Sequence, residues 1–191
     1  MKLIAPMLVI PIIFLSSCGV FNRMTIKTTF DKKEYEPYSK NGSGKISGQL
    51  FAKTRGGDIK QGAGEYVYLF PATAYVKDII SQLRTKEQPA LEQFGLLKEQ
   101  CDPMWVNSLR TPINAVFDST FQSDVICKLA KQVQCDGSSG FEFTNLPAGE
   151  YYVEAAISWV ITSGPNGSSG ATIRRFVTVK DGENSKIVMT P

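Results

Sequence analysis

The stretch PAGEYYVEAAISW, residues 147–159, carries the strongest core signal in this sequence. Pro147 and Gly149 are typical turn residues, and apolar side chains follow them at every second position. In an extended chain alternate side chains point to the same face, so these apolar side chains line one face of a single strand. They are Tyr151, Val153, Ala155, Ile157 and Trp159. The stretch therefore predicts a long strand that packs against a core.

Shorter strand-like stretches lie on both sides of this strand. A predicted strand begins at Lys45, where Ile46, Leu50 and Ala52 share one face. The other predicted strands are 65–70, a segment that ends near Cys135, 141–143, 173–180 and 185–189. Short strands separated by glycine-rich turns are typical of an antiparallel sandwich. We therefore expect a mainly β fold, a seven-stranded antiparallel sandwich.

The alternation disappears between about residues 72 and 125. Tyr75, Ile79, Ile80 and Leu83 instead lie at helical spacing. Roughly fifty residues are too many for a plain hairpin loop. We therefore expect a partly helical insertion at about 72–125, with one or two helices that cover one side or edge of the sandwich.

Three segments follow one another in an order that resembles carboxypeptidase regulatory-like domains. They are GKISG at 44–48, VYLFP at 67–71 and GFEFTNLPAGEYYV at 140–153. Domains of that family have a seven-stranded transthyretin-like (prealbumin-like) sandwich, so the resemblance implies this fold outside the insertion. Members of the family are not catalytic. They serve as binding, positioning or stiffening modules in secreted and envelope proteins. The resemblance thus implies a binding or structural role.

The first residues have the pattern of a secretory leader. Lys2 supplies one positive charge, and an apolar run follows from Leu3 to Leu15. Thirteen helical residues span about 20 Å, which is too short for a hydrocarbon core of roughly 30 Å. We expect residues 1–17 to be a signal peptide that is removed.

The tetrad Leu15-Ser16-Ser17-Cys18 resembles the lipobox of bacterial lipoproteins. The resemblance implies that Cys18 is acylated through its sulfur and becomes the new N-terminus. Several acyl chains anchor a protein stably, so the expected partner is a membrane that the protein does not cross. Gly19, rather than an aspartate, follows Cys18. The resemblance therefore implies the bacterial outer membrane, with the domain in the periplasm or at the cell surface.

Residues 18–44 are predicted to be the lipidated N-terminus and a tether, and residues 45–191 the sandwich domain with its insertion. The segment is polar and ends in Asn41-Gly42-Ser43-Gly44. As a coil its 26 residues after Cys18 would span roughly 28 Å. The alternation over 24–30 also allows a short strand there.

The composition excludes several kinds of chemistry. The 191 residues are 42% hydrophobic and 20% charged, and none is a histidine. Without histidine the chain lacks Ser-His-Asp and Cys-His nucleophile activation and His-containing zinc sites. A net charge of +3 spread over the chain gives no clustered basic face for nucleic acid. We therefore expect no catalytic residues, no cofactor and no nucleic-acid partner.

Three cysteines remain once Cys18 is assigned to lipid. Cys101, Cys127 and Cys135 allow one disulfide and one leftover thiol in an oxidising compartment. A fully extended segment would separate Cys127 and Cys135 by about 26 Å, whereas a helix and a turn would bring them together. A bridge from Cys101 to either of the other two is favoured because it would staple the insertion. The C-x-x-C spacing of metal sites is missing, so we expect no metal.

Two groups of side chains are candidates for a site. The aromatic residues Trp105, Tyr66, Tyr68 and Tyr152 could form a recognition surface for glycan or protein, although ordinary strand packing is favoured for the tyrosines. The insertion that carries Cys101 and Trp105 is the better place for recognition, since long elaborations on a rigid scaffold often bind partners. Carboxylate pairs such as Glu34/Glu36 and Glu150/Glu154 could serve glycan hydrolysis, but eighteen acidic residues produce such pairs by chance.

The sequence therefore predicts a membrane-anchored envelope lipoprotein that is not an enzyme and that binds an envelope protein or glycan. A narrower alternative is a structural lipoprotein of a secretion machine, since the small lipoprotein of type VI systems has a similar sandwich. A carboxylate-based glycan hydrolase is the competing class.

Overall fold

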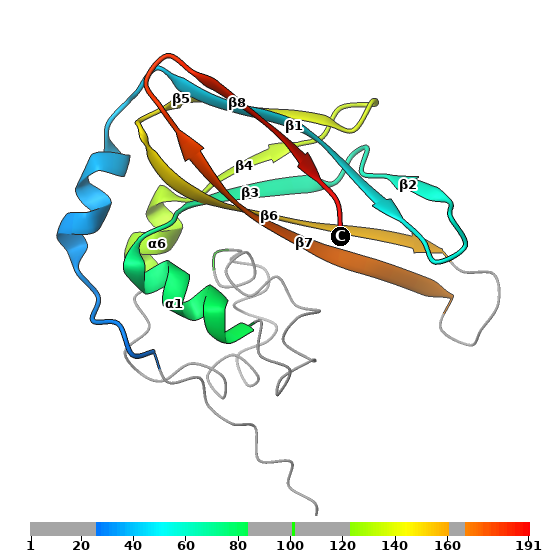
Figure 1. The fold of residues 1–191 in the computed structure, drawn as a ribbon, viewed down its shortest axis with the longest axis horizontal. Helices are drawn as coiled ribbons and strands as arrows, with labels where there is room; N and C mark the ends of the chain where they lie inside the picture. The colour runs from blue at the N-terminus through cyan, green and yellow to red at the C-terminus, as the bar shows by residue number, and fades with distance from the viewer. Residues whose placement is uncertain (1–25, 84–100, 102–122, 161–166) are drawn as a thin grey trace, which may run out of the picture.

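The computed structural model describes residues 26–83, 101, 123–160 and 167–191. In these residues two β-sheets face each other, and helices lie against one of them (Figure 1). The first sheet consists of β1 (Gly44–Lys53), β2 (Ile59–Gln61), β5 (Gly140–Leu146) and β8 (Asn184–Met189). The second sheet, in the order β4-β3-β6-β7, consists of β3 (Tyr66–Pro71), β4 (Lys131–Gln134), β6 (Gly149–Val160) and β7 (Ser168–Val179). The mainly β, sandwich-like fold expected from the sequence is confirmed.

Strand β6 has the predicted core face. Tyr151, Val153, Ala155 and Ile157 are buried between the sheets, and Trp159 packs against the same cluster. β6 forms an antiparallel hairpin with β7 over its whole length, from the pair Gly149 and Val179 to the pair Val160 and Ser168. The long alternating stretch therefore becomes a central strand of the second sheet, between β3 and β7.

The first sheet differs from the expectation in two respects. The structure describes eight strands rather than seven, because the three-residue β2 pairs with the end of β1. In addition, β8 runs parallel to β1, whereas the other strand pairs are antiparallel. Alternation shows which face of a strand is buried, but it carries no information about the neighbour or the direction of pairing.

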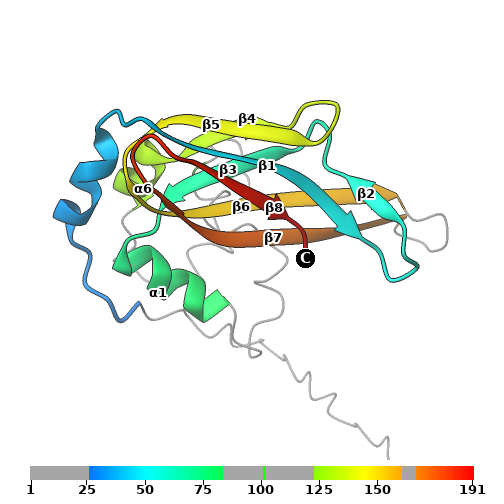
Figure 2. The same ribbon diagram turned by 45° about the horizontal axis from the view of Figure 1, so that its top comes forward.

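Three helices form a layer outside the second sheet (Figure 2). They are the 3-10 helix η1 (Lys32–Ser39) and the α-helices α1 (Ala74–Leu83) and α6 (Ser123–Leu129). α1 contains the residues with helical spacing and packs Tyr75, Ile79 and Ile80 inward. Among the described residues, no helix is long and apolar enough to cross a membrane.

Residues 26–39 of the predicted tether 18–44 are folded and form part of this layer. The backbone N–H groups of Lys27 and Thr28 both donate to Oδ2 of Asp78 in α1, each over 2.7 Å. The ring of Phe30 stacks on Tyr35 and meets the edge of Tyr75. No strand forms over 26–30, because backbone N–H groups of this segment donate to the Asp78 side chain instead of to a neighbouring strand.

The core between the sheets should dominate stability. Leu69 is 1% exposed in that core, so Leu69→Ala removes buried methyl groups and leaves a cavity. We expect the free energy of unfolding to fall by about 2–5 kcal/mol, measured by urea denaturation. Val188→Ala is the matched control, because Val188 is 51% exposed, and it should change stability by less than about 0.5 kcal/mol. Equal effects of the two substitutions would contradict the assignment of the core.

Candidate functional site

Both faces of the second sheet contribute buried side chains. Its inner face joins the core between the sheets, and part of its outer face meets the helical layer through Phe70 and Tyr152. The side chains of that second cluster are Tyr35, Phe70, Ala72, Tyr75, Val76, Ile79, Ile80, Ile126 and Tyr152. The described helices therefore close that part of the outer face to a ligand from solvent.

The predicted aromatic surface does not form as one patch. Tyr66 is 43% exposed and Tyr68 is half-buried, with their ring centroids 6.4 Å apart. Tyr152 is fully buried beneath the helical layer, so its ring cannot be offered to a ligand. Trp105 lies outside the described residues. The alternation placed Tyr68 and Tyr152 on the outer face of the sheet, but helices from elsewhere in the chain cover that face.

A buried polar group accompanies Tyr152. The hydroxyl of Tyr152 donates to Oε2 of Glu154 over 2.5 Å, and Arg174 Nε lies 3.5 Å from the same oxygen. Glu154 and Arg174 are directly opposite each other in the β6–β7 ladder. Burial raises the pKa of Tyr152 well above its usual value. A fully buried carboxylate is tolerated only with such partners, so this group has a structural role in holding β7 to β6.

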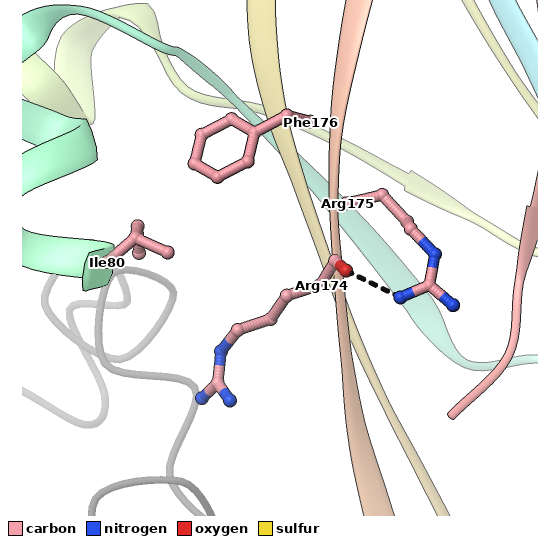
Figure 3. Close-up of a pocket in the computed structure, with 4 residues that line it drawn as sticks. All are labelled: Ile80, Arg174, Arg175 and Phe176. Carbon is pink, nitrogen blue, oxygen red and sulfur yellow. Dashed lines mark hydrogen bonds between the residues drawn. The ribbon is translucent and has the colours of Figure 1, made fainter. Parts of the chain in front are cut away.

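Beside this group is a small cavity of about 180 Å³ (Figure 3). Ile80 of α1 and Arg174, Arg175 and Phe176 of β7 line it. Arg174 and Phe176 point to the side of β7 that faces α1, whereas Arg175 points to the other side and donates from Nη1 to the carbonyl oxygen of Arg174. The volume is below the roughly 300–1,000 Å³ of typical ligand pockets. This cavity is therefore too small for a typical ligand.

A larger groove lies where η1, the start of α1 and the turn before β6 meet. Its volume is about 460 Å³, which is within the range of ligand pockets. The lining residues are Glu34, Pro37, Tyr38, Ala72, Thr73, Ala74, Lys77, Ala148 and Glu150. The groove combines an aromatic ring and a proline with a few charged groups. This composition is common in sites that bind small polar molecules.

Hydrogen bonds fix the polar groups of the groove. Glu34 Oε2 accepts from the backbone N–H of Ala74 over 2.9 Å, at the N-terminus of α1. Lys77 Nζ donates to Glu150 Oε2 over 2.6 Å, and Tyr38 donates its hydroxyl proton to the carbonyl oxygen of Glu150 over 3.1 Å. Burial raises the pKa of Tyr38, so its hydroxyl stays protonated near neutral pH. Both carboxylates therefore hold structure in place, which differs from the pairing of a free acid and a free base that hydrolysis requires.

The turn before β6 shapes one wall of the groove. Tyr151 donates from its hydroxyl to the carbonyl oxygen of Pro147 over 2.8 Å, which closes the turn. The ring of Tyr38 packs edge-on against Tyr151, with centroids 5.2 Å apart. A Cβ atom at Gly149 would lie only 2.9 Å from Cε1 of Tyr38. Glycine at 149 is therefore what allows η1 to approach β6.

The groove brings together residues from different carboxylate pairs of the sequence analysis. Glu34 and Glu150 line one groove, although they were paired with Glu36 and Glu154 by sequence. Tyr38 and Lys77 were missed, because Tyr38 lies in the predicted tether and Lys77 on a predicted insertion helix. The i, i+3 spacing of Tyr35 and Tyr38 in an otherwise polar segment is the signal that indicates a packed helix there.

The cysteines are separated into a bridge and a buried thiol. Cys101 and Cys127 form a disulfide with a Cα–Cα distance of 5.0 Å, one of the two pairings favoured from the sequence. Cys135 is free and buried in the core between the sheets, and burial raises the pKa of its thiol to about 11. Among the described residues, no group of three or more Cys, Asp or Glu side chains could hold a metal ion.

No protein-family profile and no curated protein matches the chain. Among solved structures, it is similar to a protein from Pseudomonas aeruginosa described as a "putative carbohydrate binding protein". That similarity has a TM-score of 0.60 and 24% identity, and it covers 86% of this chain and 99% of the other. At this level of identity the similarity shows a shared fold.

The chain also matches two streptococcal pilins more weakly. One is a minor pilin from Streptococcus agalactiae, with a TM-score of 0.33 and 13% identity over 79% of this chain and 44% of the pilin. The other is the pilus backbone of Streptococcus pneumoniae, with a TM-score of 0.30 and 15% identity over 78% of this chain and 41% of the pilus protein. These two similarities are too low to inform the function.

Tyr35 beneath the groove should make the protein sensitive to alkali. Its hydroxyl accepts from Thr73 Oγ1 over 2.8 Å, and burial raises its pKa to about 12. The pKa of Tyr35 in the folded state therefore lies above its unfolded value of 10.0. The stability that the protonated Tyr35 hydroxyl contributes is complete below pH 10 and is lost as the pH rises to about 12. We expect Tyr35→Phe to make this alkaline loss less steep, measured by urea denaturation at a series of pH values.

Urea denaturation at neutral pH gives a second measurement on the same variant. At neutral pH, Tyr35→Phe should cost about 1 kcal/mol through the lost hydrogen bond with Thr73. A profile with Tyr35→Phe that equals that of the unchanged protein between pH 10 and 12 would show that Tyr35 is not buried as described.

Proposed function

We propose that this protein is an envelope lipoprotein, anchored by acyl chains on Cys18, whose sandwich binds a glycan without catalysing a reaction. The observation that carries the binding role is the groove of about 460 Å³ between η1, α1 and β6, whose charged groups are already fixed by hydrogen bonds. The tetrad Leu15-Ser16-Ser17-Cys18 supports the anchor, and Gly19 supports the outer membrane as its location.

The chemistry of the groove suits a saccharide. The half-buried ring of Tyr38 and the adjacent Pro37 offer apolar surface to the C–H groups of a sugar ring. Lys77 and Glu150 provide a donor and an acceptor for hydroxyl groups, and their mutual ion pair holds both side chains in place. The similarity to a structure described as a "putative carbohydrate binding protein" is compatible with this choice of ligand.

The same groups argue against the competing enzymatic function. Hydrolysis by two carboxylates needs one that is protonated and one that is free to act on water or on the sugar. In this groove Glu34 accepts from the α1 backbone and Glu150 pairs with Lys77. A second carboxylate on β6, Glu154, is fully buried with Tyr152 and Arg174.

We further infer that the sandwich is of the transthyretin-like class found in carboxypeptidase regulatory-like domains. The support is the segment 140–153, in which β5 ends at Leu146, a turn closed by Tyr151 follows, and β6 begins at Gly149. The role as a structural lipoprotein of a secretion machine stays a prediction, which the genes next to this one would test.

The anchor can be tested directly by labelling. Cells that produce the protein are grown with radiolabelled palmitate, and the protein is then isolated. We expect label in the unchanged protein and none in Cys18→Ser. Cys135→Ser is the matched control and should keep the label, because its thiol is buried in the core. Label that persists in Cys18→Ser would refute acylation at this residue.

Binding in the groove can be tested with an array of bacterial envelope saccharides. The full-length protein in detergent should bind at least one saccharide on the array. Tyr38→Ala and Lys77→Ala should each weaken that binding by about tenfold or more, since they remove apolar contact or a charged donor. Tyr66→Ala is the control, because Tyr66 is an exposed aromatic residue outside the groove, and it should leave the binding unchanged.

The pattern of these variants decides between the two surfaces. Loss with Tyr38→Ala but not with Tyr66→Ala assigns the ligand to the groove, provided that both variants unfold at unchanged urea concentrations. The opposite pattern moves the site to Tyr66 and Tyr68. If the unchanged protein binds no saccharide on the array, the glycan function is wrong.

A further inference from the structure

The chain between the acylation site and the folded domain is short. Ile26 is already packed against the helical layer, so only residues 19–25 lie between it and Cys18. Eight steps from Cys18 to Ile26 span at most about 26–29 Å, even when fully extended. For comparison, the twelve residues of β6 measure about 40 Å. The anchor is therefore too short for the domain to turn freely above the membrane.

The starting point of this short linker is fixed to α1. Asp78 accepts from two successive backbone N–H groups, of Lys27 and Thr28. Ile26 and Phe30 pack toward the helical layer, while Lys27 and Thr29 between them are exposed. In Figures 1 and 2 the described chain begins on the side of α1, across the second sheet from β1, β5 and β8. The linker of residues 19–25 therefore joins the domain on the α1 side.

The segment at this end of the domain presents basic side chains. Lys27, Lys32 and Lys33 are exposed, and none of them has an ion-pair partner among the described residues. Asp31 and Asp78 accept hydrogen bonds from backbone N–H groups and keep their negative charge. With three lysines and one aspartate, residues 26–33 carry a net charge of +2, followed by the exposed Glu34 and Glu36.

We propose that residues 26–33, the basic arm, lie against the membrane and bind anionic phospholipid headgroups. This proposal rests on the acylation of Cys18, which brings the arm within reach of the bilayer. Each lysine near an anionic surface contributes about fivefold to membrane affinity, and the effect is screened within about 10 Å at moderate salt. The arm would hold the domain in one orientation, with the outer face of β1, β5 and β8 turned away from the membrane.

The orientation can be measured on the acylated, full-length protein. It is reconstituted into vesicles of phosphatidylcholine alone or of phosphatidylcholine with phosphatidylglycerol, and exposed lysines are acetylated and counted by mass spectrometry. On the anionic vesicles we expect labelling of Lys27, Lys32 and Lys33 to fall by about fivefold. Labelling of the controls Lys45, Lys53 and Lys186, which are exposed on the first sheet, should stay the same. High salt should abolish the protection.

Flotation separates a failure of the arm from a failure of the anchor. An acylated protein floats with neutral vesicles whether or not the basic arm binds headgroups. Failure to float therefore refutes the anchor. A protein that floats with both kinds of vesicle but shows equal labelling of Lys27, Lys32 and Lys33 on both refutes the basic arm.

A pair of charge-matched variants provides the second measurement. In the Cys18→Ser protein, replacing Lys27, Lys32 and Lys33 by Gln should lower the ratio of affinities for anionic and neutral vesicles by about 100-fold. Replacing Lys45, Lys53 and Lys186 by Gln changes the net charge equally but should leave this ratio within about fivefold. Equal losses in the two variants would show that only net charge matters and would overturn the proposal.

Discussion

Burial of β6 on both of its faces is the constraint on which the rest of the structure depends. Its inner side chains, such as Val153, form the core between the sheets, while Tyr152 on its outer face packs beneath η1, α1 and α6. A strand buried in this way has no face left for solvent, so its one central charge must be compensated. Glu154 accepts a hydrogen bond from the Tyr152 hydroxyl and forms an ion pair with the Arg174 guanidinium, which ties β7 into the same arrangement.

The groove is a consequence of how the N-terminal segment returns to this strand. η1 approaches the start of β6 because Gly149 has no side chain in the path of Tyr38. Glu34 then reaches the first turn of α1, and Lys77 of α1 reaches Glu150 of β6. Hydrogen bonds thus connect three elements that are far apart in the sequence around the groove. A binding function uses such rigidity well, because the polar groups need no reordering when a ligand arrives.

The same return of the chain shortens the segment that leads back to Cys18. Residues that a polar composition suggested as a free tether are instead held by Asp78 and by the stacked ring of Phe30. The basic arm and the groove therefore lie on connected parts of one helical layer. With the acylation of Cys18 proposed above, recognition would take place close to the bilayer rather than at the end of a long flexible stalk.

The sequence by itself determined the sandwich and the core face of β6, because apolar side chains at every second residue of an extended chain lie on one face. It also indicated the helix at α1, whose apolar spacing is local. It could not provide β2, which has three residues and forms only against the end of β1, or the parallel pairing of β8 with β1.

Only the tertiary structure decided which aromatic side chains face solvent. Tyr66 and Tyr152 look alike in a strand pattern, yet one is 43% exposed and the other is fully buried. The difference arises because helices from remote segments cover one part of the sheet face and leave another open. The groove residues Glu34, Tyr38, Lys77 and Glu150 likewise meet only through these long-range contacts, which no local pattern encodes.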